Sequence, residues 1–298
     1  MIAYKMTPCY RAGEQTPWGG DRLKALYGKQ IPDPRTGESL EASTLSGRES
    51  TGPGGMTLTQ IAGGELPLML KLLDARETLS VQVHPDDAYA SREGKLGKAE
   101  AWLILDAEPG AQLVYGLLPG ADLAGLPPEA LEARLRWVPV KAGDVLNIPP
   151  GMVHAIGPGI VLYEIQQTSD ATYRFHDWNR LDSHGNPREL HLKQALDVAR
   201  ADLQLPILGG EPTVMEGGSA THYLTTEHFT LSMLHAKGRL LLPGRKGFAF
   251  LTALCDGRLE RGAEALPFAR GETFFLPRGF SDLYIVAEGD LVISGDVP

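Results

Sequence analysis

The chain has 298 residues, enough for one large domain or two smaller ones with their own hydrophobic cores. Its 28 lysines and arginines against 37 aspartates and glutamates give a net charge of −9, which repels a nucleic-acid backbone, so no nucleic-acid partner is expected. No stretch has the apolar length of a membrane span and no signal peptide is recognisable, so no membrane partner is expected either. Cys9 and Cys255 provide neither a disulfide framework nor a cysteine zinc site, which favours the cytoplasm.

Turn-forming residues punctuate the whole chain. Its 35 glycines and 22 prolines separate short apolar runs, a pattern typical of a mainly β protein with many turns. Residues 1–65 are expected to be irregular with a few strands. Further along, the pattern predicts strands over residues 66–73, 79–84, 99–105, 111–118 and 160–166. It predicts helices directly after Pro85 and over residues 128–137 and 189–201. Residues 209–219 are poor in apolar side chains and are interpreted as a linker, which divides the chain into 1–208 and 209–298.

Residues 143–157 read GDVLNIPPGMVHAIG and predict a strand, a forced turn and a second strand beside the first. The turn lies at Pro149, Pro150 and Gly151, and His154 falls near the start of the second strand. Its imidazole would then point into the space that the strands enclose. Because a lone histidine in a hairpin is more often structural, the interpretation of His154 depends on its neighbours.

The same pattern occurs again near the end of the chain. GETFFLPRGFSD, residues 271–282, matches GDVLNIPPGMVH at two glycines and one proline, with Asp282 at the position of His154. Two strand-turn-strand units of one design predict a duplicated β-barrel whose second copy lacks the histidine.

Metal-ligand side chains gather on the predicted strands around this motif. Ser80, Gln82 and His84 share one face of their strand, because side chains alternate between faces with a period of two. Glu100 lies on the next strand and His154 on a later one. Two imidazoles and a carboxylate, with the Gln82 amide as a fourth ligand, suit Zn²⁺, Fe²⁺ or Mn²⁺.

The spacing of residues 143–154, G-x5-P-x-G-x2-H, resembles the second motif of the cupin superfamily. As a whole the chain resembles the short bacterial type I mannose-6-phosphate isomerases, from the N-terminus to about residue 200 and weakly beyond it. The segments that carry the likeness are PWGG 17–20, ESLEAS 38–43, LPLMLK 66–71, LSVQVHPD 79–86, GKAEAW 97–102, residues 143–157 and DATYRFHDW 170–178. The order LSVQVHPD then GKAEAW is the most specific of these. Leu40 stands where the family often has tryptophan, which affects local packing only.

The resemblance implies two cupin-type jelly-roll barrels with a few short helices: a metal-binding catalytic domain, 1–208, and a C-terminal domain, 209–298, without metal ligands. It implies one zinc ion per chain, with manganese, iron and cobalt left open as the metal. The implied ligands are Gln82, His84, Glu100 and His154. The implied catalytic residues are Arg174 and Lys98, and the residues implied to face a sugar-phosphate substrate are Ser80, Lys71 and Lys98.

The expected activity is interconversion of mannose 6-phosphate and fructose 6-phosphate by proton transfer between C2 and C1 through an enediolate. Lys98, His176 and Asp177 are candidates for the proton-transfer base, and Glu41 is a weaker one. Two other classes stay open at this point: an iron-dependent cupin oxygenase, which uses a similar ligand set, and a sugar-phosphate-binding protein without catalysis. The oligomeric state is left open as well.

Overall fold

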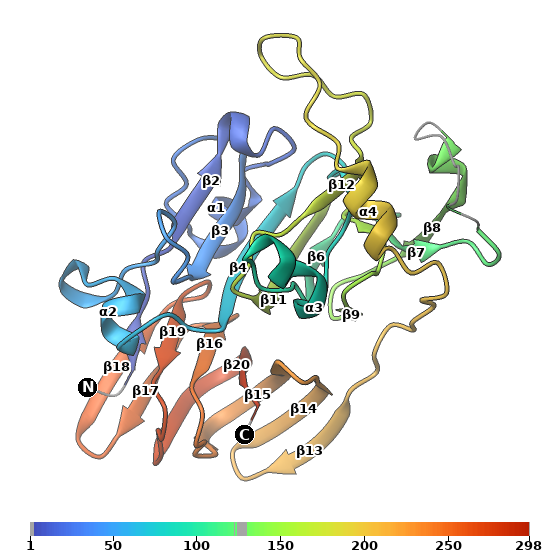
Figure 1. Cartoon of the computed structure of the whole chain (residues 1–298). Helices are drawn as coiled ribbons and strands as arrows, with labels where there is room; N and C mark the ends of the chain where they lie inside the picture. The colour runs from blue at the N-terminus through green and yellow to red at the C-terminus, as the bar shows by residue number, and fades with distance from the viewer. Residues whose placement is uncertain (1–2, 122, 124–129, 298) are drawn as a thin grey trace.

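The fold of a computed structural model, which describes residues 3–121, 123 and 130–297, is mainly β, as predicted (Figure 1). Its strand pairings are antiparallel and form three sheets. The helices are short, and they are α1 (Arg22–Tyr27), α2 (Leu58–Ala62), α3 (Asp87–Ala90) and α4 (Leu192–Val198), with 3-10 turns at Gly13–Gln15, Pro53–Gly55, Ser91–Glu93 and Glu132–Arg134. None of the helices in the described ranges has the length and hydropathy needed to cross a membrane.

Two of the sheets are built from the first 176 residues. The six-stranded sheet has the order β2 (Cys9–Ala12), β3 (Thr36–Ala42), β4 (Leu68–Ala75), β11 (Ile160–Gln167), β6 (Glu100–Ala107) and β9 (Val145–Ile148). The five-stranded sheet has the order β12 (Tyr173–His176), β5 (Val81–Val83), β10 (His154–Ala155), β7 (Gln112–Leu117) and β8 (Leu135–Pro139). Leu162 of the first sheet and Leu113 of the second belong to one hydrophobic cluster, so the two sheets pack face to face.

The third sheet has nine strands and contains the C-terminal part of the chain, seen in orange and red in Figure 1. Its strands are β1 (Tyr4–Lys5), β19 (Thr273–Leu276), β16 (Ala249–Ala253), β20 (Leu283–Asp296), β15 (Phe229–Leu242), β14 (Gly218–Thr225) and β13 (Glu211–Met215), with β17 (Gly257–Arg261) and β18 (Glu264–Phe268) paired beside β20. The N-terminal strand β1 therefore completes the C-terminal sheet. The division at residue 208 and the second barrel stay predictions.

Alternation along β11 gives the six-stranded sheet two different faces. Tyr163 and Ile165 point into a hydrophobic cluster shared with Phe250 and Val292 of the C-terminal sheet. The Tyr163 hydroxyl also lies 2.6 Å from Ser294 Oγ in the buried interface. The side chains between them, such as Glu164, face the opposite way, toward the five-stranded sheet. One face thus holds the C-terminal sheet while the other is available for a cavity.

Two expectations from the sequence were wrong in their local structure. The helix predicted over 128–137 falls partly outside the described residues, and the rest is the 3-10 turn Glu132–Arg134 followed by β8. Cross-strand pairing of Trp137 with Val114 overrides the helical period there. The linker predicted over 209–219 is the β13–β14 hairpin, and it is poor in apolar residues because β13 is an exposed edge strand.

The turn at 149–151 was predicted correctly, but the strands on its two sides belong to different sheets. β9 pairs with β6 in the six-stranded sheet, whereas β10 pairs with β5 and β7 in the five-stranded sheet. The prediction that they lie side by side was wrong, because each finds its partner far away in sequence. The turn instead connects the two sheets, so that His154 lies in the five-stranded sheet.

Gly151 is the residue of this turn that tolerates no side chain. Its φ of +86° is a left-handed conformation, and a Cβ there would lie 2.9 Å from the Val198 carbonyl oxygen. Gly143 has a similar φ of +91° with open space around it.

We expect Gly151→Ala to lower the free energy of unfolding by roughly 2–4 kcal/mol, because strain and a backbone clash add. Gly143→Ala is the matched control, with a loss of about 1–2 kcal/mol from backbone strain alone. Urea denaturation of both variants measures the difference. Equal losses would contradict the view that close packing against Val198 limits this turn.

Candidate metal centre

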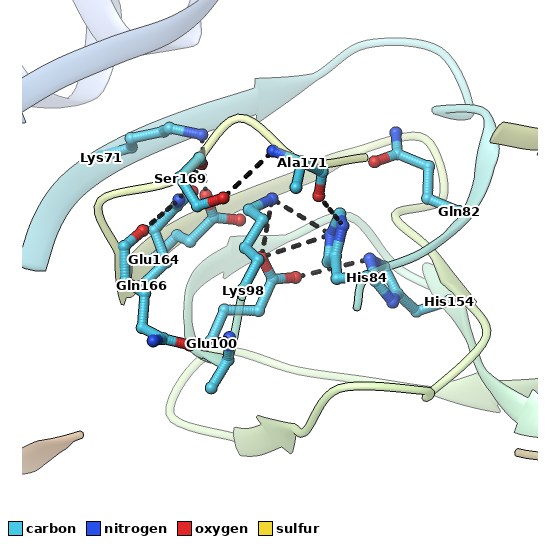
Figure 2. Close-up of polar contacts among 12 residues, drawn as sticks. Lys71, Gln82, His84, Lys98, Glu100, His154, Glu164, Gln166, Ser169 and Ala171 are labelled. Atoms are coloured by element: carbon cyan, nitrogen blue, oxygen red, sulfur yellow. Dashed lines mark hydrogen bonds and ion pairs between the residues drawn. The ribbon is translucent and has the colours of Figure 1, made fainter. Parts of the chain in front are cut away.

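Three buried ligand side chains meet between the two N-terminal sheets. His84 follows β5, Glu100 begins β6 and His154 begins β10, and their ligand atoms all lie within 4.8 Å of one another. His84 Nε2 is 3.6 Å from Glu100 Oε2, and His154 Nε2 is 3.4 Å from Glu100 Oε1 (Figure 2). The cluster is the one group of this kind in the described part of the chain. Each sheet contributes ligands, so the site exists only when the two sheets pack.

Backbone carbonyls orient both imidazoles. His84 Nδ1 lies 3.0 Å from the Ala171 carbonyl oxygen, and His154 Nδ1 lies 2.9 Å from that of Met152. A carbonyl only accepts, so the Nδ1–H group donates in each case. The lone pair of each Nε2 is therefore directed toward Glu100, which is the arrangement of metal-bound histidines.

Burial keeps the histidines neutral. It lowers the pKa of His154 to about 4, and together with the positive charge of Lys98 it lowers the pKa of His84 well below the ordinary value. Burial also raises the pKa of Glu100 to about 7, although Lys98 acts in the opposite direction. Neutral imidazoles are what a divalent metal requires of its ligands.

The Glu100 carboxylate fits a bound cation. Both of its oxygens are buried, and neither accepts a well-aligned hydrogen bond from a described residue, although Lys98 Nζ lies 3.0 Å from Oε2. Lys98 Nζ is also 3.1 Å from His84 Nε2. An unsatisfied buried carboxylate is costly, and a divalent cation between Glu100 and the two histidines would offset that cost.

Gln82 lies on the same cavity wall without joining the cluster directly. Its backbone pairs with His154 on one side and Arg174 on the other, so the three residues form one row across the five-stranded sheet. Its amide Nε2 donates to Ser80 Oγ over 2.9 Å, which leaves its oxygen available. Its role as a fourth ligand remains a prediction.

The cluster lies in a cavity of about 460 Å³ between the sheets. The predicted residues Lys71, Ser80, Lys98 and Arg174 all line it. Seven of its lining side chains are lysine or arginine and five are aspartate or glutamate, so they carry a net charge of +2 in a chain whose net charge is −9. The cavity therefore favours a small anionic ligand that the outer surface would repel.

Glu164 is a cavity residue that the sequence reasoning missed. It lies between Lys71 and Trp102 in the six-stranded sheet, 3.1 Å from Lys71 Nζ, and it accepts from Trp102 Nε1 over 3.0 Å. Lys71 Nζ is also 3.9 Å from Glu38. Burial opposes the charge of both groups, but the pair keeps the pKa of Lys71 raised and that of Glu164 lowered. The sequence signal for Glu164 was a single carboxylate within the apolar run IVLYEIQ, residues 160–166.

Arg174 is held on the cavity wall without a carboxylate partner among the described residues. Its Nη1 donates to the Glu189 carbonyl oxygen over 2.7 Å, and its Nε lies 3.4 Å from Ser80 Oγ. Burial and the positive charge of Arg188 lower its pKa from the ordinary value. A guanidinium with five N–H donors keeps several of them for a ligand.

Of the four candidates for the proton-transfer base, Lys98 is the one that lines the cavity. His176 Nε2 lies 2.9 Å from Glu132, and Asp177 is bound by two arginines. Glu41 is fully buried against Lys29 Nζ, 2.6 Å away. These three positions are typical of structural roles.

We expect metal affinity to fall about tenfold per pH unit below pH 7, because Glu100 must lose its proton to bind a cation while His154 is already neutral. Competition titration of zinc against a chromophoric chelator at pH 6, 7 and 8 measures this. In Glu100→Gln the affinity should be weaker and independent of pH over this range. A flat profile in the unaltered protein would show that Glu100 does not compete for protons at the site.

Comparison with known proteins gives a consistent result. Residues 40–102 match the family model described as phosphomannose isomerase type I, catalytic domain. Mannose-6-phosphate isomerase ManA of Bacillus subtilis (strain 168) is 34% identical over 93% of this chain and 94% of its own length.

Solved structures agree with this assignment. The crystal structure of the mannose 6-phosphate isomerase from Bacillus subtilis superimposes with a TM-score of 0.91 at 30% identity, covering 99% of both chains. A mannose 6-phosphate isomerase solved in its holo, zinc-bound form shares the fold, with a TM-score of 0.76 at 15% identity over the whole of both chains. With its buried ligand cluster in a positively charged cavity and its similarity to these enzymes over nearly the full length, the chain belongs to the type I mannose-6-phosphate isomerase family.

Proposed function

We propose that this chain interconverts mannose 6-phosphate and fructose 6-phosphate in the cytoplasm with one bound zinc ion. The observation that carries the proposal is the convergence of His84, Glu100 and His154 in a cavity lined by net positive charge. A relative of the same fold is zinc-bound, which supports the choice of metal. The two cysteines are unpaired, which agrees with a reducing compartment.

We propose that Gln82 completes the ligand set with its amide oxygen. It lies beside His154 in the five-stranded sheet, and its amide nitrogen is directed toward Ser80. Two nitrogens and two oxygens without a thiolate suit zinc, and manganese, iron and cobalt are also compatible with this set. When bound, the metal would polarise the substrate carbonyl as a Lewis acid and hold the oxygens at C1 and C2.

Lys98 is the proposed proton-transfer residue. Its Nζ touches both Glu100 and His84, so among the candidates it lies at the reacting end of the cavity. Moving a proton between C2 and C1 requires one group within reach of both carbons, which a flexible lysine provides.

Arg174 is proposed to stabilise the negative charge that develops on the enediolate. It lies in the same cross-strand row as Gln82 and His154, and its guanidinium is already positioned by Glu189 and Ser80. A preorganised cation at a developing oxyanion contributes more than one that must reorganise. Ser80 and Lys71 also line the cavity and would contact the substrate there, Lys71 at the sugar.

A coupled assay tests the activity. Metal-stripped protein should form fructose 6-phosphate from mannose 6-phosphate only after zinc, manganese, iron or cobalt is restored, with product detected through glucose 6-phosphate formation. Sugar-phosphate binding without turnover would contradict the proposal. Oxygen consumption with Fe²⁺ would contradict it in favour of an oxygenase.

We expect His154→Ala to lose metal and turnover together, because it removes one of three convergent ligands. Arg174→Ala should keep the metal content of the unaltered protein and lose turnover by roughly 10²–10³-fold. Metal analysis by mass spectrometry beside the coupled assay separates the two effects. Full metal content in the His154 variant would exclude that residue as a ligand.

A further inference from the structure

The segment between β12 and α4 forms a hairpin, and the second arm of this hairpin lies at the cavity. The Asp182 side chain accepts from the backbone N–H groups of His184 and Asn186, and Leu181 forms a β-bridge with Pro187. In Figure 1 this segment is the yellow loop that projects from the top of the molecule. The second arm of the hairpin places Arg188 in the cavity wall.

The return segment is bonded to β12 beside Arg174. The His191 backbone N–H donates to the Arg174 carbonyl oxygen over 2.8 Å, and the Arg174 N–H donates to His191 Nδ1 over 3.2 Å. The Glu189 carbonyl oxygen accepts from the Arg174 guanidinium. Arg174 and the segment that carries Arg188 are thus fixed relative to one another.

The first turn of the hairpin is strained and tightly held. Trp178 and Asn179 have φ values of 55° and 53°, which are unfavourable for residues with a side chain. Trp178 Nε1 donates to the Leu79 carbonyl oxygen over 2.7 Å, and Arg180 Nη2 donates to that of Thr78 over 2.8 Å. These bonds attach the hairpin to the segment that leads into Ser80.

The base of the hairpin has more positive charge than its carboxylates can neutralise. Asp177 is buried and receives Arg188 Nε over 2.6 Å and Arg188 Nη2 over 2.5 Å. The same carboxylate also receives Arg180 Nη1 over 3.2 Å. Arg174 adds a third guanidinium without a carboxylate partner among the described residues. Arg180 also lies 3.6 Å from Glu77 Oε2. Three arginines facing two carboxylates still leave positive charge for an anion.

We propose that Arg188 is a phosphate-binding residue of this enzyme, with Ser80 on the same wall of the cavity, and that Asp177 is the positioning residue that orients it. The proposal rests on the proposed isomerase function and names the subsite that makes it specific for a phosphorylated sugar. Arg188 has donors left on Nη1 after Asp177 has used Nε and Nη2.

The position along the cavity suits the substrate. Ser80 and His84 are four residues apart in an extended segment, about 13 Å at the rise of a β-strand. An open-chain hexose phosphate can lie along such a wall, with its reacting carbons at the metal ligands and its phosphate at Arg188. Lys71 fits the phosphate less well, because Glu164 already compensates its charge.

Arg48 also lines the cavity and is the main competitor for this role. In the described part of the chain its side chain has no hydrogen-bond or ion-pair partner. A free arginine loses conformational entropy when it binds, whereas Asp177 has already ordered Arg188. The geometry therefore favours Arg188.

The test uses metal-loaded full-length protein with inorganic phosphate as a competitive probe. Arg188→Gln should raise the inhibition constant for phosphate and the KM for mannose 6-phosphate by roughly 10- to 100-fold, as expected for lost charge-assisted hydrogen bonds. Its metal content should stay unchanged. Asp177→Asn should raise both constants by a smaller factor with little change in kcat, and Arg188→Lys should recover part of the loss.

Arg180→Gln is the matched control, because Arg180 binds the same carboxylate but does not line the cavity. It should lower thermal stability and leave the inhibition constant for phosphate within about twofold. An equal rise in Arg180→Gln would mean that hairpin placement, not contact with Arg188, causes the effect. An unchanged constant in Arg188→Gln, or a rise confined to Arg48→Gln, would overturn the proposal. Absence of isomerase activity in the unaltered protein would instead contradict the proposed function.

Discussion

The buried carboxylate of Glu100 is the group on which the rest of the site depends. Taking a charged carboxylate out of water is costly unless cations and donors surround it. Here the first strand residue of β6 faces two neutral imidazoles from the opposite sheet, and it also faces Lys98, which lies two positions before it in the chain. Packing of the two sheets therefore buries the Glu100 carboxylate and also brings together the groups that stabilise it. A divalent metal would stabilise its charge further. The positive side chains around the site also explain why an acidic protein can accept an anionic sugar.

Local periodicity made much of this site predictable. The alternation in LSVQVH places Ser80, Gln82 and His84 on one face, and these three residues do line one cavity. Strand faces depend only on neighbours two residues away, so sequence alone is enough to assign them. The family resemblance added Arg174, which no period could have found.

The features that the sequence did not predict depend on long-range pairing. Whether β9 and β10 share a sheet is decided by partners that lie dozens of residues away. Leu135–Pro139 is a strand because Trp137 pairs with Val114. The hairpin that returns Arg188 to the cavity has no regular period to detect. Such choices are made by tertiary contacts and not by local propensity.

The two copies of the strand-turn-strand motif share their glycines and differ at the position of His154. β19 spans Thr273–Leu276, 128 positions after β9, and the glycines before the two strands have φ values of +90° and +91°. The turn glycines after them, Gly279 and Gly151, are left-handed too, with φ values of +75° and +86°. The second copy ends in Asp282, not histidine, in a sheet that holds no ligand cluster in its described residues. The turn therefore serves strand geometry in both copies, and only the first copy places a histidine in the ligand cluster.

The geometry of the site predicts that His84, Glu100 and His154 hold a metal ion between the two N-terminal sheets. Anomalous X-ray scattering from crystals of the zinc-loaded protein, recorded above and below the zinc absorption edge, tests it most directly. We expect one strong anomalous peak per chain within about 2.0–2.2 Å of the two Nε2 atoms and a Glu100 oxygen. A peak bound elsewhere, with these three side chains uncoordinated, would contradict it.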